Sequence, residues 1–168
     1  SIEGVCWGGG AWIVAAYDGL WRSVTGLAGS WTLVLSVSNM WSARFLNGAW
    51  VATGRNVIYT STDAGVTWER VVLVSTAGST DIFSVAYGAG RYVACTTASL
   101  YSSIDLLNWT VQSLAGSWKD IIFDDDNGLF VLVGGSGANP PKISTSPEGL
   151  VFTARTVPAG HTTSHYNA

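Results

Sequence analysis

The feature that most constrains the fold of this chain is an internal repeat of about forty residues. Four segments each place an aromatic residue two positions after a glycine and before apolar β-forming residues. These aromatic residues, spaced 38, 42 and 38 residues apart, are Trp12, Trp50, Tyr92 and Phe130. A second aromatic series lies upstream, at Trp7, Phe45, Tyr87 and Phe123. A third series joins Ser23, Ser61, Ser103 and Thr145 to Trp31, Trp68, Trp109 and Phe152. Three series in step indicate four copies of one structural unit.

Each copy contains four short runs of strand-forming residues separated by Gly, Asn or Asp turns. The runs are 4–7, 11–17, 20–24 and 30–35, then 42–46, 49–54, 57–62 and 67–72. They continue at 82–87, 91–96, 100–103 and 109–111, then 120–123, 129–133, 142–145 and 150–155. A four-stranded antiparallel sheet in every forty residues is typical of a propeller blade, so we predict an all-β fold, a four-bladed β-propeller. The expected blades are 1–39, 40–78, 79–116 and 117–160, followed by a polar C-terminal tail, 161–168.

Composition supports this class and excludes others. Aromatic residues make up 12% of the chain and charged residues 11%, against about 25% charged in an average globular domain. This much apolar material excludes disorder, and so little charge argues against exposed helical faces. The net charge of −3, with eight basic residues, leaves no basic stripe for binding nucleic acid. No apolar run approaches the roughly 20 residues of a membrane helix, so membrane insertion is not expected either.

The two cysteines, Cys6 and Cys95, are expected to be free thiols. They are too few for a disulfide framework, and they lie far apart in the sequence. Each sits inside an apolar run, so we predict that both are buried and behave as small hydrophobic residues. The redox compartment of the protein therefore stays open.

One predicted turn carries a recognisable motif. Residues 61–68 read Ser-Thr-Asp-Ala-Gly-Val-Thr-Trp. This segment resembles the Asp-box, Ser-x-Asp-x-Gly-x-Thr-Trp, of sialidase-like β-propellers, which is also called the BNR repeat. Degenerate copies lie at 103–109, one residue short, and at 145–152, which lacks the Asp. The wider pattern, over about residues 4 to 157, resembles Asp-box propeller repeats of bacteriophage tail and other virion proteins.

The Asp-box is interpreted as a structural clasp between the third and fourth strands of a blade. The Asp63 carboxylate can accept backbone N–H bonds across its own turn, as in an Asx-turn. Gly65 supplies a positive φ, and Trp68 packs inward between strands. The resemblance implies the same structural role for the whole motif, including Ser61 and Thr67, at a distance from the ligand-binding face.

The resemblance also raises sialidase activity as an enzymatic alternative. It implies an arginine triad on the substrate carboxylate, a tyrosine–glutamate nucleophile and an aspartate acid. Of the six arginines, only Arg44 falls on a predicted innermost strand. The others are Arg22, Arg55, Arg70, Arg91 and Arg155. The arginine motif that opens sialidase propellers is missing, and four blades fall short of their six, so we expect no enzymatic activity.

Other patterns for catalysis or metal binding are weak. His161 and His165 lie in the polar tail, where a flexible or docking segment is favoured over a metal site. The run Asp124-Asp125-Asp126-Asn127-Gly128 lacks the alternating ligands and terminal Glu of an EF-hand, so a solvated hairpin tip is favoured over a weak cation site. We therefore expect no metal and no cofactor.

A binding surface is the better functional hypothesis. Trp41, Phe83 and Trp118 recur near the start of the innermost strand, four, four and five residues before the upstream aromatic of their copy. Aromatic rings clustered at one end of the central axis can stack on sugars, with Arg44 and Lys119 as polar contacts. The alternative is that these aromatic side chains wedge between adjacent blades.

Two non-enzymatic classes stay open. The first is a virion or tail-associated structural protein that contacts other protein subunits or a host surface glycan, in a virion or extracellular location. Low charge fits a surface that is partly covered in an assembly. The second is a free lectin-like, carbohydrate-binding propeller. Four blades either close as a small propeller or belong to a larger ring that further chain or a second copy completes.

Overall fold

The computed structural model describes residues 1–71, 80–112, 114, 116–136 and 139–157. In that part of the chain it contains sixteen strands and no helix, and the strands form four four-stranded sheets. Neighbouring strands are antiparallel, so the prediction of an all-β fold made of four-stranded antiparallel blades is confirmed. The end of the second expected blade, 72–78, and the expected tail 161–168 with His161 and His165 lie outside the described residues.

Each sheet consists of four consecutive strands in chain order. The first contains β1 (Ile2–Gly8), β2 (Ala11–Ala16), β3 (Gly19–Ser23) and β4 (Thr32–Ser36). The second contains β5 (Met40–Leu46), β6 (Ala49–Gly54), β7 (Val57–Ser61) and β8 (Glu69–Val71). The third contains β9 (Ile82–Gly88), β10 (Arg91–Thr96), β11 (Leu100–Ser103) and β12 (Thr110–Gln112). The fourth contains β13 (Trp118–Asp124), β14 (Leu129–Ser136), β15 (Asn139–Ser146) and β16 (Thr153–Arg155). Every blade is thus a local meander.

The hairpins depend on residues that tolerate a positive φ. Between β5 and β6, Asn47 and Gly48 have φ values of 48° and 82°. These values fit a two-residue turn of type I′, whose twist matches that of the flanking strands. Ala89 and Gly90 adopt similar values, 48° and 73°, between β9 and β10. Local turn chemistry therefore sets the boundary between the first two strands of these blades.

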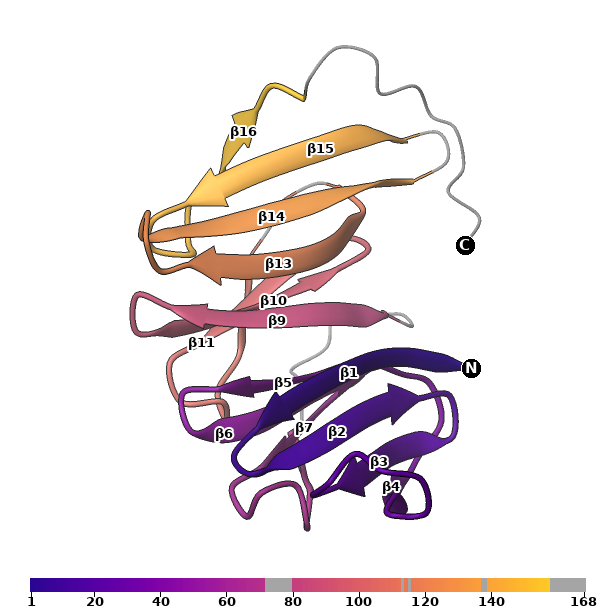
Figure 1. The fold of residues 1–168 in the computed structure, drawn as a ribbon. Helices are drawn as coiled ribbons and strands as arrows, with labels where there is room; N and C mark the ends of the chain where they lie inside the picture. The colour runs from indigo at the N-terminus through magenta and orange to yellow at the C-terminus, as the bar shows by residue number, and fades with distance from the viewer. Residues whose placement is uncertain (72–79, 113, 115, 137–138, 158–168) are drawn as a thin grey trace.

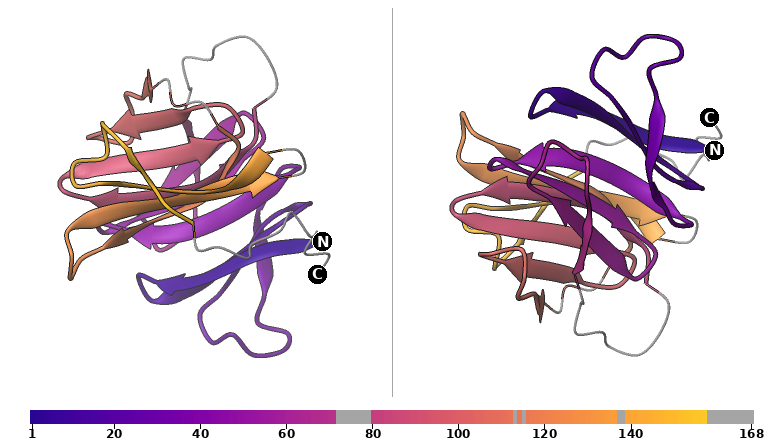
Figure 2. Two further views of the ribbon diagram at one scale, coloured as in Figure 1. Left: turned by 90° about the horizontal axis from the view of Figure 1, so that it is seen from above. Right: turned by 90° about the horizontal axis from the view of Figure 1, so that it is seen from below.

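The four blades follow one another along a common inner edge. Their first strands pack side by side in the order β1, β5, β9, β13, and their last strands lie at the outer edge. In Figure 1 the first blade lies at the bottom and the fourth at the top, with the other two between them. Figure 2 views this stack from its two ends.

Three buried clusters join the blades, one for each successive pair. In each cluster, aromatic or other apolar side chains of one blade pack against aliphatic side chains of the blade before it. Trp50 packs with Ile13 and Leu20 between the first and second blades, and all three are fully buried. Phe130 packs in the same way with Val93, between the third and fourth blades.

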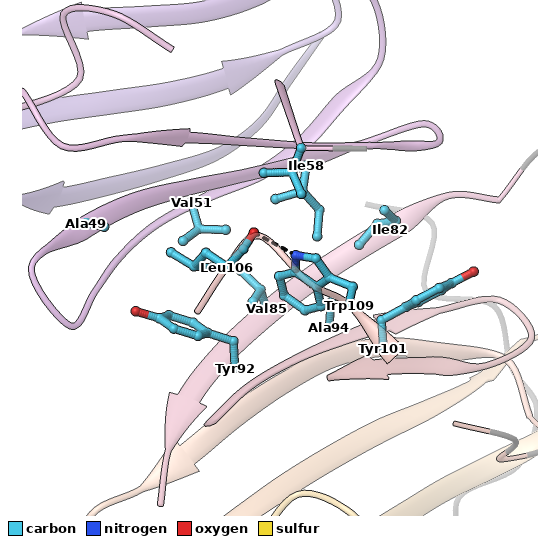
Figure 3. Close-up of a cluster of buried hydrophobic side chains, with 11 residues drawn as sticks. Ala49, Val51, Ile58, Ile82, Val85, Tyr92, Ala94, Tyr101, Leu106 and Trp109 are labelled. Atoms are coloured by element: carbon cyan, nitrogen blue, oxygen red, sulfur yellow. Dashed lines mark hydrogen bonds between the residues drawn. The ribbon is translucent and has the colours of Figure 1, made fainter. Parts of the chain in front are cut away.

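The cluster between the second and third blades shows how a turn contributes to this packing. In Figure 3, Leu106 lies between Val51 of the second blade and Val85 of the third. The indole Nε1 of Trp109 donates to the carbonyl oxygen of Leu106 at 2.9 Å. The turn after β11 is therefore part of the contact between blades.

Two sequence expectations need correction. Ser61 pairs with Trp50, and the residue that pairs with Phe130 in the same way is Ser146, so Ser146 and not Thr145 is the equivalent position in the fourth copy. Both cysteines are free thiols, but only Cys95 is buried, whereas Cys6 is partly exposed. Burial raises the pKa of Cys95 to about 12.

Candidate binding site at the inner edge

The innermost strands of all four blades line one hollow of about 460 Å³. Its floor and walls include one residue from each blade at the same register position, four residues before the upstream aromatic of that copy. These four residues are Glu3, Trp41, Phe83 and Lys119. A carboxylate, two aromatic rings and an ammonium group thus lie around one space, because each blade presents the same position to it.

The aromatic part of the hollow is formed by the second and third blades. The rings of Trp41 and Phe83 lie with centroids 6.2 Å apart and planes inclined by 42°. The Lys119 ammonium lies 3.9 Å from the centroid of the Phe83 ring, close enough for a cation–π interaction. Lys119 is therefore held over one aromatic ring, and both rings border the hollow.

An ion pair crosses the hollow from the second blade to the fourth. Arg44 Nη2 donates to Asp120 Oδ1 at 2.9 Å, and the backbone N–H of Ile121 donates to the same oxygen at 2.9 Å. The two charged side chains are 35% and 48% exposed, so solvent screens the pair and it adds little to stability. Its main structural effect is to fix where the two charges lie.

Three donors on residues that line the hollow are buried without a hydrogen-bond partner among the described residues. They are Trp41 Nε1, Arg44 Nε and Ser84 Oγ. A buried donor without a partner costs about 1–3 kcal/mol, so buried polar groups are normally paired. The three donors thus lie unpaired beneath the surface of the hollow.

The structure brings together four of the five predicted ligand-facing residues and excludes one. Trp41, Arg44, Phe83 and Lys119 line the hollow. Trp118 does not: it is only 2% exposed and packs between the third and fourth blades. It lies five residues before the upstream aromatic of its copy, so the alternation of the strand turns it away from the axis, and Lys119 takes its place.

Sequence reasoning also missed members of the site. Glu3, Ser84 and Asp120 line the hollow. Glu3 and Lys119 each lie four residues before the upstream aromatic of their copy, so counting back four residues in every copy would have identified both. The degenerate first copy hid this signal, because it has a carboxylate where two other copies have aromatic residues.

Residues 61–68, the segment that resembles an Asp-box, form a hydrogen-bonded turn between β7 and β8, and none of them lines the hollow. The Asp63 carboxylate accepts the N–H of Val66 at 3.1 Å and of Thr67 at 2.9 Å. It also accepts the hydroxyls of Ser61 at 2.8 Å and Thr67 at 2.6 Å. Hydrogen bonds, first that of the Thr67 hydroxyl, hold the pKa of Asp63 far below its usual range. The Trp68 indole N–H donates to the Gly65 carbonyl at 3.1 Å.

The shorter copy of the motif closes in the same way. Asp105 Oδ1 accepts the N–H groups of Leu107 and Asn108 at 2.9 and 2.8 Å, and the Ser103 hydroxyl at 3.0 Å. These bonds, chiefly those from Asn108, lower the pKa of Asp105 well below its ordinary value. One residue fewer therefore does not prevent the carboxylate from bridging its turn.

The acidic run after β13 also forms a local turn. Asp124 accepts hydrogen bonds from the backbone N–H of Asp126 at 3.1 Å and of Asn127 at 3.2 Å. The Asn127 side chain donates to Asp124 at 2.7 Å, and this bond is the first cause of the lowered pKa of Asp124. Within the described residues there is no group of three or more His, Cys, Asp or Glu side chains arranged to hold a metal ion.

The arginines are spread over the blades. Arg44 is the arginine that lines the hollow. Arg22 Nε donates to the Ala64 carbonyl of the next blade at 2.8 Å, and Arg55 pairs with Asp81 at 3.1 Å. In the part of the chain that the structure covers, no helix is long and apolar enough to cross a membrane.

Comparison with known proteins gives a fold and no family. No protein-family model and no curated protein matches this sequence. The chain is similar to the extracellular domain of a protein described as a hybrid two-component system from B. thetaiotaomicron, with a TM-score of 0.73, 12% identity, and coverage of 99% of this chain and 24% of that one. An ancestral GH74 enzyme has a TM-score of 0.66 and 14% identity, with coverage of 88% and 23%.

A third neighbour is the WD40 domain of Neurospora crassa Pan2, with a TM-score of 0.67, 7% identity, and coverage of 92% of this chain and 48% of that one. This chain therefore spans between about a quarter and a half of the length of these three neighbours. At such low identity the likeness shows the fold alone, a β-propeller arrangement of blades.

Proposed function

We propose that this chain is a non-catalytic binding and scaffold module, and that its inner-edge hollow binds a carbohydrate. The observation that carries the proposal is the pair of rings, Trp41 and Phe83, beside charged and polar groups in one hollow of about 460 Å³. That volume lies within the range of about 300–1,000 Å³ that is typical of small-molecule sites.

Sugars present two kinds of surface that match this hollow. The C–H face of a pyranose packs on an aromatic ring, as flat apolar surfaces do in other sites. Its hydroxyl groups need both donors and acceptors, which Lys119, Arg44 and Glu3 supply. The unpaired N–H of Trp41 and hydroxyl of Ser84 lie just beneath the surface of the hollow, where a shift of the side chain would let each donate to such a ligand.

We propose a non-catalytic function because the charged groups of the hollow are arranged to hold a ligand. Hydrolysis of a glycoside requires one carboxylic acid that is kept protonated near the bond and a second carboxylate as nucleophile or base. Of the carboxylates at the hollow, Asp120 is held in an ion pair with Arg44. Release of product from a chromogenic sialoside or glucan oligosaccharide would contradict this part of the proposal.

The location and the protein partners rest on the repeat pattern. Its resemblance to tail-protein repeats supports an extracellular or virion-associated scaffold that touches other subunits, with host surface glycan as the ligand. A free lectin is the alternative. Exposed apolar side chains on the first and last blades favour the scaffold, because large apolar patches usually mark interaction sites.

The test is a titration of the purified chain against a panel of bacterial and animal glycans, read by calorimetry. Trp41→Ala is expected to weaken binding of the recognised glycan by roughly twofold to tenfold, since one aromatic stacking contact contributes about 0.5–1.5 kcal/mol. Lys119→Ala is expected to weaken it by at least about tenfold, since a hydrogen bond from a charged group contributes about 1.5–3 kcal/mol. Trp7→Ala is the matched control: it removes an indole from another innermost strand, outside the hollow, and is expected to leave affinity unchanged. Silence across the panel, or equal losses in Trp7→Ala and Trp41→Ala, would overturn the proposal.

A further inference from the structure

The first and last blades each expose an apolar sheet face of a kind that the inner blades bury. The leading face of the first blade is formed by Val5, Trp7, Trp12, Val14 and Trp21. The trailing face of the fourth blade is formed by Ile122, Val131, Val133 and Ile143. Val5 is 60% exposed and Trp7 50%, while Ile122 is 49% exposed. A hollow of about 780 Å³, lined in part by Val14 and Trp21, lies on the leading face.

The leading face has the same construction as the faces that pack on a preceding blade. Trp7 and Trp12 lie directly opposite each other, with ring centroids 5.1 Å apart. The equivalent pairs, at 5.4, 4.5 and 4.8 Å, are Phe45 and Trp50, Tyr87 and Tyr92, and Phe123 and Phe130. In the other three blades the second member of the pair is buried against the blade before it, but Trp12 is partly exposed. Among the described residues, the leading face therefore has no preceding blade against it.

The trailing face has the same construction as the faces that pack on a following blade. In the fourth blade Val131 pairs with Ile122, and the equivalent pair in the first blade is Ile13 and Cys6. Likewise, Val133 pairs with Ile143 in the fourth blade, and Ala15 pairs with Leu20 in the first. The equivalents of Val131 in the first three blades, Ile13, Val51 and Val93, are all fully buried by the next blade. In the part of the chain that the structure describes, the trailing face therefore has no following blade against it.

The turn after the third strand contacts the preceding blade in the fourth blade, and the first blade can be compared with it. Gly149 and Gly26 both have a φ of 73°, and each donates its N–H to the serine three residues before it, at 2.9 and 2.8 Å. A Cβ on Gly149 would meet Phe130 of its own blade and Val93 of the preceding blade. For a Cβ on Gly26, the nearest atoms all belong to Trp12 of its own blade. Among the described residues, no counterpart of Val93 is found among the atoms nearest to Gly26.

A polar bond between blades has an unused equivalent on the trailing face. Gln112 pairs with Leu100, and its side-chain Nε2 donates to the Gly149 carbonyl of the next blade at 3.1 Å. Arg155 pairs with Ile143 in the same register, so it is the equivalent residue on the fourth blade. Its Nε donates to Thr145 Oγ1 at 2.8 Å, and the guanidinium has further N–H groups to offer.

We propose that a second copy of this chain covers both faces. The trailing face of each copy packs on the leading face of the other, Val131 lies against Gly26, and Arg155 donates to the Gly26 carbonyl. The two contacts are related by a twofold axis and close a ring of eight blades. Three internal contacts in this chain already show that such faces are complementary, so the new contact repeats an established one.

The number of blades in known propellers limits the ring to two copies of this chain. Propellers typically contain 4–8 blades, so a chain with four blades fits a ring of one or two copies, and three copies exceed the range. In the described residues, the cluster of the first blade joins it to the second and that of the fourth joins it to the third, with no cluster between the first and fourth. One copy therefore leaves its two end faces apart, and a second copy is the occupant that matches both.

The experiment measures the mass of the 168-residue chain by sedimentation equilibrium at micromolar concentration. The expected mass is twice the 17.7 kDa of one chain. Val14→Asp on the leading face and Val131→Asp on the trailing face each place a carboxylate in the contact, so each is expected to raise the dissociation constant by at least about a hundredfold. Val66→Asp, at an exposed valine outside both faces, is the matched control and stays dimeric. Circular dichroism verifies that each variant is folded.

Mixing the two disrupted variants distinguishes this arrangement from other dimers. A mixed dimer has one contact in which both faces are wild type, so a dimer is expected to reappear when Val14→Asp and Val131→Asp are combined. A monomeric wild type would overturn the proposal, and so would a mass above two copies. Dimers that survive Val131→Asp would also overturn it, because they would show that two leading faces pair with each other.

Discussion

The first and second blades are built alike but have different surroundings. Each carries an aromatic pair at the same register, Trp7 with Trp12 and Phe45 with Trp50. Trp50 is fully buried because the first blade covers it, whereas Trp12, its equivalent, is partly exposed. The repeat therefore specifies which residues form a face, and the neighbouring blade decides whether that face is buried. In repeat architectures stability is approximately a sum of such unit and interface terms.

The largest expected effect comes from truncating the same aromatic in the two blades. Trp50→Ala is expected to lower the free energy of unfolding by about 3–5 kcal/mol, as for large core aromatics. Trp12→Ala, in dilute monomer, is expected to cost about 1–2 kcal/mol, because less apolar surface leaves water there. Urea denaturation at low protein concentration measures both values. Equal losses in the two variants would show that the neighbouring blade does not control these positions.

Protein concentration sharpens the same comparison. If a second copy covers the leading face, the effect of Trp12→Ala grows with protein concentration, since association stabilises only the wild type. The effect of Trp50→Ala is expected to change little, because this residue is buried inside one chain. A Trp12→Ala effect that is constant over a hundredfold range of concentration would separate the leading face from any self-association.

Glycines in the turns offer a second contrast between covered and open positions. Gly65 and Gly48 have φ values of 78° and 82°, but a Cβ on Gly65 would lie 2.6 Å from Ile13 Cδ1 and a Cβ on Gly48 would meet nothing within 4 Å. Both alanine variants should lose about 1–2 kcal/mol for the positive φ. Gly65→Ala should lose about 1 kcal/mol more from crowding in the buried cluster.

A second substitution identifies the source of that difference. Ile13→Val removes the Cδ1 atom that the new methyl group would meet. In the Ile13→Val background, the difference in cost between Gly65→Ala and Gly48→Ala in denaturant unfolding is therefore expected to fall by most of its value, since the remaining contact, to Cγ1, is at 3.3 Å. A difference that persists at full size in this background would place the strain within the turn and not between the blades.

The strands and the inner-edge residues differ in how far the sequence predicts them. The strands were predictable because turns such as Asn47-Gly48 and the alternation of apolar residues are local signals. Trp118 was placed wrongly because it lies five residues before the upstream aromatic of its copy, whereas the residues that line the hollow lie four before it, and a shift of one residue moves a side chain to the other face. The exposure of the leading face was not predictable, because the repeat pattern does not tell whether another blade packs against the first one.

The turns of the first and second blades also differ in their expected response to pH. In the second blade Asp63 bridges the turn, and in the first blade the Ser23 hydroxyl alone accepts the N–H groups of Thr25 and Gly26, at 3.2 and 2.8 Å. Because folding lowers the pKa of Asp63, its contribution to stability is present above the unfolded pKa of about 4 and is lost as pH falls toward the folded value.

Asp63→Asn is therefore expected to destabilise the protein at pH 7, with a difference from wild type that shrinks as the pH falls below about 4. Urea unfolding at a series of pH values measures it. Ser23→Ala is the control, and its effect is expected to be independent of pH, because a serine hydroxyl does not titrate in this range. A constant difference for Asp63→Asn down to the lowest pH would show that the charge of the carboxylate contributes nothing.

The smallest expected effect concerns the polar residue at one position on the third and fourth blades. Gln112→Ala removes the bond to the Gly149 carbonyl and is expected to lower the free energy of unfolding by about 0.5–1.5 kcal/mol. Arg155→Ala should change it by less than about 0.5 kcal/mol in dilute monomer, because this exposed side chain contacts no following blade. In the dimer, however, each of the two contacts loses this bond, about 1–3 kcal/mol in all, so the dissociation constant should rise by roughly fivefold to a hundredfold. Sedimentation equilibrium measures that change, and an unchanged constant would remove Arg155 from the contact while the apolar faces stay in it.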